Sequence, residues 1–79
     1  MKELLQYIIE GISGSKDFEI EESQNPEGQL ILKIVAPQEI MGIIIGKGGS
    51  TIKSIQNLVR VKARLENKFV YVNVEEKTP

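Results

Sequence analysis

The chain has 79 residues, of which 41% are hydrophobic and 27% charged, a composition typical of one small globular domain. It contains no Cys and no His, which excludes a disulfide framework, a thiolate metal site and a histidine general base. The net charge of −1 conceals an asymmetry, because residues 1–40 hold three Lys and eight acids whereas residues 41–79 hold seven Lys and Arg and three Glu. The second half is therefore the half suited to a polyanionic partner.

The first predicted element is an amphipathic helix over residues 2–12. Its apolar side chains recur at helical spacing: Leu4, Leu5, Ile8, Ile9 and Ile12. Gln6 and Glu10 interrupt the apolar run, so it resembles neither a signal peptide nor a membrane span. We therefore expect a soluble, cytoplasmic protein.

A β-hairpin is predicted next. "DFEIEE" alternates apolar and acidic residues around Phe18 and Ile20, which indicates a half-buried strand. "NPEG" (25–28) places its Asn, Pro and Gly where a type I turn favours them. "QLILKIV" (29–35) is almost entirely apolar and rich in branched residues, as expected of a central strand.

Two helices and a last strand follow. Residues 38–45 form the first helix, and Ser50 or Thr51 is expected to cap the second, which runs to about Ala63. "VKARLE" (61–66) also alternates and could form a strand instead. "FVYVNV" (69–74) is the last strand, and the polar tail after it is expected to fray. The inner stripe of the second helix is predicted to contain Ile52, Ile55, Leu58 and Val59.

This order predicts an α+β fold, α-β-β-α-α-β, with a three-stranded mixed sheet and the helices on one face. The two-helix crossover is long enough to make the second and third strands parallel. We expect a single domain over residues 1–79, with an ordered core of about 2–75. No element remains to cover the other sheet face, so an interface is predicted there, formed by Ile31, Val35, Phe69 and Tyr71.

The stretch "GKGG" (46–49) lies between the two later helices. A reversal between helices needs one left-handed residue, so we expect the other glycines to let a ligand approach the backbone. Free N–H groups at a helix start, with Lys47 beside them, suit a phosphate. A Walker A loop does not fit, because Gly42 and Gly46 are separated by three residues and Lys47 precedes Gly48. The dinucleotide-binding fingerprint does not fit either.

"IIGKGGSTIKSI" (44–55) resembles the signature of the KH domain, and the element order resembles its type II arrangement. "VAP" (35–37), "MG" (41–42) and "VYVNV" (70–74) are similar to the small bacterial KH proteins of the KhpA/YlqC group. The resemblance implies a non-catalytic module without a cofactor that holds single-stranded RNA, or single-stranded DNA, by a Gly-x-x-Gly loop. It also implies a role as an RNA chaperone or post-transcriptional regulator, and a homodimer or a heterodimer with a second KH-containing protein of the Jag type.

On this resemblance, the phosphates pass over the loop and bases rest on an apolar floor. The expected RNA-binding residues are Gly46, Lys47, Gly48, Gly49, Ser50, Ile44, Ile52, Lys53 and Ile55, with Leu32 or Ile34 added from the strand. Ile43, Ser50 and Gln56 stand where members of the group often carry basic residues. Lys53, Arg60, Lys62 and Arg64 could compensate, although one helix cannot aim all four at one groove. The alternative is a KH-like protein-interaction scaffold with little nucleic-acid binding.

Overall fold

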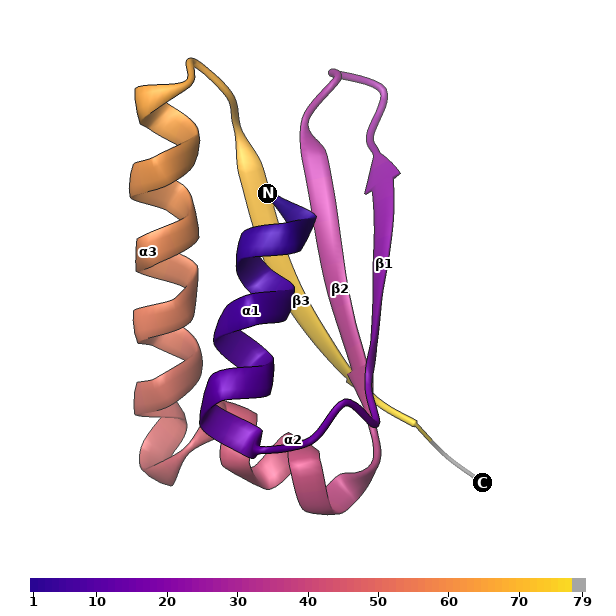
Figure 1. Cartoon of the computed structure of the whole chain (residues 1–79). Helices are drawn as coiled ribbons and strands as arrows, with labels where there is room; N and C mark the ends of the chain where they lie inside the picture. The colour runs from indigo at the N-terminus through magenta and orange to yellow at the C-terminus, as the bar shows by residue number, and fades with distance from the viewer. Residues whose placement is uncertain (78–79) are drawn as a thin grey trace.

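The computed structural model describes residues 1–77 and has the predicted order of elements. They are α1 (Lys2–Ser13), β1 (Glu19–Gln24), β2 (Leu30–Ala36), α2 (Gln38–Ile45), a 3-10 turn η1 (Lys47–Gly49), α3 (Ser50–Leu65) and β3 (Val70–Glu76). Figure 1 shows the α+β architecture, with all three helices on one side of the sheet. The predicted fold class is confirmed.

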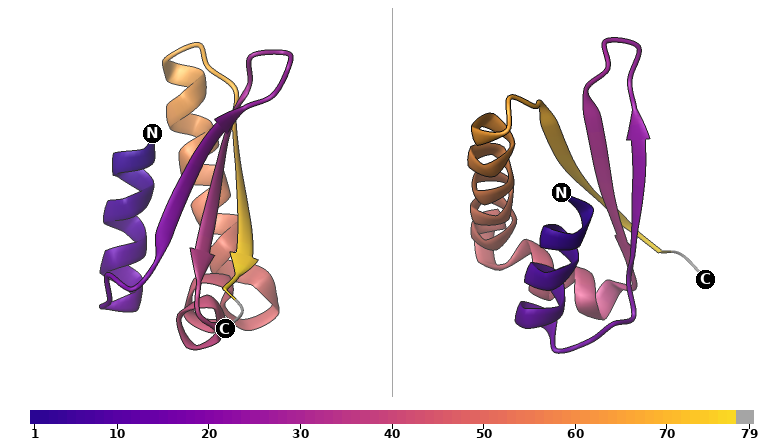
Figure 2. Two further views of the ribbon diagram at one scale, coloured as in Figure 1. Left: turned by 90° about the vertical axis from the view of Figure 1, so that its right-hand side faces the viewer. Right: turned by 45° about the horizontal axis from the view of Figure 1, so that its top comes forward.

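The sheet has the order β1-β2-β3. β1 and β2 form the predicted antiparallel hairpin, and β2 and β3 are parallel, joined through α2 and α3. The "NPEG" turn is closed by a hydrogen bond that the N–H of Gly28 donates to the carbonyl of Asn25 at 2.9 Å. Figure 2 shows the twist of this sheet and its outer face, which none of the helices within residues 1–77 covers.

The core lies between the helices and the inner face of the sheet. Its fully enclosed large side chains come from α1, β2, α2 and α3: Leu5, Ile9, Leu32, Ile34, Ile44 and Val59. Burial of each such side chain contributes about 1.5–3 kcal/mol. Since these residues recur at helical or alternating spacing, the apolar pattern of the sequence is what fixes which face of each element turns inward.

Three predicted boundaries are wrong. α3 continues to Leu65, which excludes a strand over 61–66, because the helical repeat of buried residues continues through Ala63. The N-cap of α3 is Gly49, and neither Ser50 nor Thr51 makes a side-chain capping bond. β3 continues to Glu76, beyond where fraying was expected, because its last residues pair in parallel with the end of β2. Residues 78–79 of the predicted fraying tail lie outside the described residues.

The outer sheet face differs from the prediction in one respect. Val35 is only 9% exposed, although it lies on this face, whereas Phe69 and Tyr71 are 65% and 50% exposed. Lys33 crosses the same face, with its Nζ 3.6 Å from a carboxylate oxygen of Glu21 and 3.6 Å from one of Glu75. The predicted apolar interface is thus reduced to the end of the sheet where β3 begins.

Candidate nucleic-acid interface

The loop between α2 and α3 is built on three glycines with positive φ. Gly46 has φ 74° and ψ 175°, a region that is essentially restricted to glycine. Gly48 (φ 65°, ψ 17°) and Gly49 (φ 78°, ψ 12°) are both left-handed. The expectation that the reversal needs only one glycine is therefore wrong, because the path of the backbone accounts for all three.

The glycines nevertheless face different surroundings. A Cβ added to Gly46 would lie 2.7 Å from the Cβ of Thr51 and 3.1 Å from its backbone nitrogen, closer than packing allows. A Cβ added to Gly48 or Gly49 would meet no atom within 4 Å. Gly46 is therefore turned against the first turn of α3, while Gly48 and Gly49 border open space that a ligand can reach.

The tip of the loop presents hydrogen-bond donors. The N–H of Gly46 donates to the carbonyl of Gly42 at 3.0 Å, and the N–H of Gly49 to that of Gly46 at 3.2 Å. Within residues 1–77, none of the backbone hydrogen bonds of the turns, loops and caps uses the N–H of Lys47 or Gly48, and Gly46 before them belongs to no helix or turn. The side chain of Lys47 is exposed beside them, and the positive end of the α3 dipole lies at the same place. Together these groups form an environment that favours an anion.

The structure brings together only part of the predicted site. Gly46–Gly49, Ser50, Ile52 and Lys53 lie at the start of α3, where Ile52 is half-buried and Ser50 and Lys53 are exposed. Four members of the predicted apolar floor are instead enclosed in the core: Leu32, Ile34, Ile44 and Ile55. Ile52 is thus the predicted floor residue that presents surface to a ligand.

The basic residues of α3 divide between two faces. Lys53, Arg60 and Arg64 recur with Gln56 at steps of three or four residues, so they lie along one side of the helix. Gln56 Nε2 donates to the backbone carbonyl of Val72 at 2.9 Å, which turns this side toward β3. The place of Gln56 in this repeat is visible in the sequence, whereas its bond to β3 is not.

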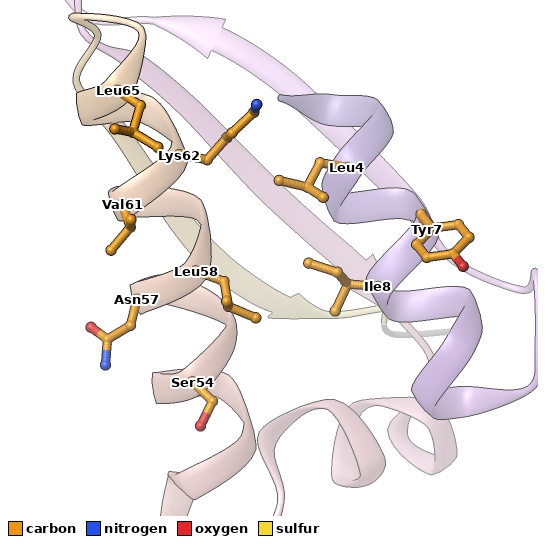
Figure 3. A pocket seen from close by; sticks show the side chains of 9 residues that line it. All are labelled: Leu4, Tyr7, Ile8, Ser54, Asn57, Leu58, Val61, Lys62 and Leu65. Carbon is orange, nitrogen blue, oxygen red and sulfur yellow. The ribbon is translucent and has the colours of Figure 1, made fainter.

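Lys62 lies on another side of α3, at a groove beside α1. This groove is open to solvent, has a volume of about 790 Å³ and is lined mainly by aliphatic side chains. In Figure 3, Ile8 of α1 and Leu58 of α3 point toward one another across it. Leu58 is 58% exposed and Leu65 is 78% exposed, so the assignment of Leu58 to the inner stripe is wrong. The signal for this surface was a second apolar stripe of Leu58, Val61 and Leu65.

Two further properties of residues 1–77 bear on function. No cluster of three or more acidic side chains is arranged to hold a metal ion in this part of the chain. None of its helices has the length and apolar character required to cross a membrane.

A three-stranded mixed sheet covered on one face by three helices, in the order α-β-β-α-α-β, defines a KH domain of type II. The family model "KhpA/KhpB, KH domain" matches residues 2–74, and the chain belongs to this family.

Curated relatives cover most of the chain. The chain is 39% identical over 59 residues to RNA-binding protein KhpA of Thermotoga maritima. The aligned region covers 75% of this chain and 79% of that protein. It is 35% identical over 75 residues to RNA-binding protein KhpA of Clostridium acetobutylicum, covering 94% of this chain and 99% of that one. A crystal structure of Era from Aquifex aeolicus superposes with a TM-score of 0.63 at 19% identity, over 96% of this chain and 29% of that chain. The likeness to Era concerns the fold alone.

Proposed function

We propose that this chain is a non-catalytic module that binds single-stranded RNA by clamping its phosphates at Gly46–Gly49. The observation that carries the proposal is the pair of unused N–H groups at Lys47 and Gly48, which lie at an exposed loop and at the start of a 16-residue helix. The relatives named RNA-binding protein KhpA support the same partner. We extend the proposal to a role as an RNA chaperone or post-transcriptional regulator.

In this proposal, a phosphate accepts hydrogen bonds from the backbone of the loop, and Lys47 and Lys53 add charge. Ser50 offers a hydroxyl, and Ile52 offers apolar surface to a base. These contacts do not read the 2′-hydroxyl, so single-stranded DNA is expected to compete. Because few phosphates are neutralised, the salt dependence should be shallow, at about 0.7 per phosphate on a single strand.

The test is a double variant, Lys47→Asp with Gly48→Asp, titrated with a short single-stranded RNA while backbone amide shifts are followed at two salt concentrations. Aspartate tolerates the left-handed conformation of Gly48 better than most residues do, and a Cβ there meets open space. We expect wild-type shifts centred on residues 46–53 that weaken as salt rises. We expect no such shifts in the variant.

A matched control keeps the change in net charge constant. Gly11→Asp with Lys16→Asp alters the charge by the same amount, and a Cβ at Gly11 also meets open space. The control should bind RNA nearly as well as the wild-type chain. An equal loss of RNA binding in both variants would show that the effect comes from net charge alone. Unchanged RNA binding in the loop variant would refute the clamp.

A second candidate function is supported by the groove between α1 and α3. An aliphatic surface that large on a small domain is typical of a protein interface, so we propose that a second KH-containing chain docks there, either a copy of this chain or a Jag-type protein. Sedimentation equilibrium should then show Leu58→Glu lighter than the wild type at the same concentration. The same shift for Tyr71→Glu alone would assign the interface to the sheet, and a monomeric wild type would exclude self-association.

If RNA causes no shifts in the folded wild-type chain, the scaffold alternative replaces the clamp. In that case the α1–α3 groove becomes the working surface, and the loop serves only to connect two helices.

A further inference from the structure

A cavity of about 180 Å³ lies at the opposite end of α3 from the glycine loop. It is lined from α3 by Arg60, Ala63 and Arg64, and from the following loop and β3 by Lys68, Phe69, Val70 and Tyr71. Three cationic and two aromatic side chains therefore line the same cavity. Figure 1 shows this corner where α3 turns into β3, with the glycine loop at the other end of the helix.

The aromatic rings are not part of the core. Phe69 is 65% exposed and Tyr71 is 50% exposed, so each presents surface to solvent. A planar ring left accessible beside guanidinium groups is the arrangement on which nucleic-acid bases stack.

The cations at this cavity are largely available to a ligand. Within residues 1–77, no carboxylate forms a salt bridge with Arg60 or Arg64. Lys68 forms a salt bridge with Glu66, in which the Nζ of Lys68 lies 3.8 Å from a carboxylate oxygen of Glu66. The two arginines are therefore the groups expected to meet phosphates, and Glu66 keeps the local charge from becoming still more positive.

The cavity is aligned with the glycine loop. Lys53, Gln56, Arg60 and Arg64 lie along one side of α3, and the hydrogen bond from Gln56 to Val72 holds that side at the edge strand β3. At about 1.5 Å per residue, Arg60 lies about 16 Å and Arg64 about 22 Å from Gly49 along the helix axis. A strand that starts at the loop and follows this side of α3 reaches the cavity.

We infer that the cavity is a second contact for the same single-stranded nucleic acid, in which a base stacks on Phe69 or Tyr71 and the flanking phosphates pair with Arg60 and Arg64. The inference rests on the proposed function, since the strand is held first at the glycine loop. It gives the domain an aromatic contact that the surroundings of the loop lack.

The experiment compares two single-stranded RNAs of mixed sequence, one of about four nucleotides, the number that a KH loop clamps, and one about twice as long. Fluorescence anisotropy gives the affinity of each for the full chain. We expect the longer RNA to bind more tightly. We also expect Phe69→Ala to weaken only the longer RNA, by about fivefold or more, which is the contribution of one stacked base.

Further variants separate stacking from packing and charge. Phe69→Leu keeps the apolar bulk but removes the flat ring, so it should behave like Phe69→Ala. Arg60→Ala and Arg64→Ala should each lower the salt slope for the longer RNA by about 0.7. Tyr7→Ala and Lys62→Ala are matched controls, because both residues line the groove on the other side of α3. Neither control should change the affinity for the longer RNA.

The outcomes distinguish this inference from the function on which it rests. Clamp-dependent binding of the short RNA without any gain for the longer one would overturn the second contact alone. Absence of binding at both lengths would overturn both proposals. Equal losses of RNA affinity in the control variants would also overturn the second contact. So would a Phe69→Leu variant that changes the molecular mass in solution but not the RNA affinity, because that result would assign Phe69 to a protein interface.

Discussion

Alanine substitutions at Gly46 and Gly48 test how the loop between α2 and α3 is built. Gly48→Ala introduces a methyl group into open space at φ 65°, so its cost is the left-handed conformation alone, about 1–2 kcal/mol. Part of that cost is offset because alanine also restricts the unfolded chain, by about 0.4–1 kcal/mol. We therefore expect Gly48→Ala to lower the free energy of unfolding by about 1 kcal/mol.

Gly46→Ala should cost much more. Its φ of 74° with ψ 175° adds about 1–3 kcal/mol of backbone strain. The new Cβ would also lie 2.7 Å from the Cβ of Thr51, and forcing extra volume into a packed site costs about 1–3 kcal/mol more. The sum is about 2–6 kcal/mol, a large part of the stability expected of so small a domain, since a chain of 79 residues is stabilised by about 0.05–0.15 kcal/mol per residue.

Urea unfolding followed by circular dichroism measures both variants, and a change in midpoint at constant slope reports the difference in stability. The double variant Gly46→Ala with Thr51→Gly removes the Thr51 side chain that the new methyl group would meet. The effects of the two substitutions on stability should therefore be coupled by about 1 kcal/mol or more in a double-mutant cycle. If Gly46→Ala destabilises no more than Gly48→Ala, or if Thr51→Gly gives no coupling, the packing of Gly46 against α3 is not as we describe.

Three further substitutions test the core and its connections. Ile44→Ala, at a fully enclosed position, should lower the free energy of unfolding by about 2–5 kcal/mol in the same urea assay; a loss below 1 kcal/mol would contradict its place in the core. Gln56→Leu removes the bond to the carbonyl of Val72 and should cost about 1 kcal/mol, with faster amide exchange in β3 as a second measurement; unchanged exchange would speak against that link. Lys33→Met breaks two exposed ion pairs and should shift the stability by less than about 1 kcal/mol, measured at low and high salt; a larger loss would mean that the pairs act as a network.

Much of the fold was predictable because the apolar pattern alternates cleanly between periods of two and about 3.6. The bounds of α2 follow from Pro37 and Gly46, and the observed helix spans Gln38–Ile45 as predicted. The end of α3 was harder to predict, because residues 61–66 satisfy both periods. The buried Ala63 decides in favour of the helix, and a small side chain gives a weak signal in sequence.

The candidate site was predictable at the loop and less so around it. Gly46–Gly49 stand out in the sequence because several positive φ angles require several glycines. Which isoleucines face the ligand depends on tertiary packing, and Ile44 and Ile55 prove to be enclosed. The aromatic cavity was missed because its members come from the end of α3 and the start of β3, which approach one another only after the chain has turned at Asn67, with φ 56°.

The parallel pairing of β2 with β3 has a consequence for how the chain folds. In the hairpin, Gln24 pairs with Leu30 across a short turn, whereas Leu30 pairs with Val70, 40 positions later. The entropy of closing so long a segment must be overcome before the central pairing stabilises the sheet. α2 and α3 lie within this segment, and they bring β3 beside β2 only when the bend between the two helices has the correct angle. The glycine loop lies within this segment, so its backbone geometry should influence the folding rate as well as the shape of the finished domain.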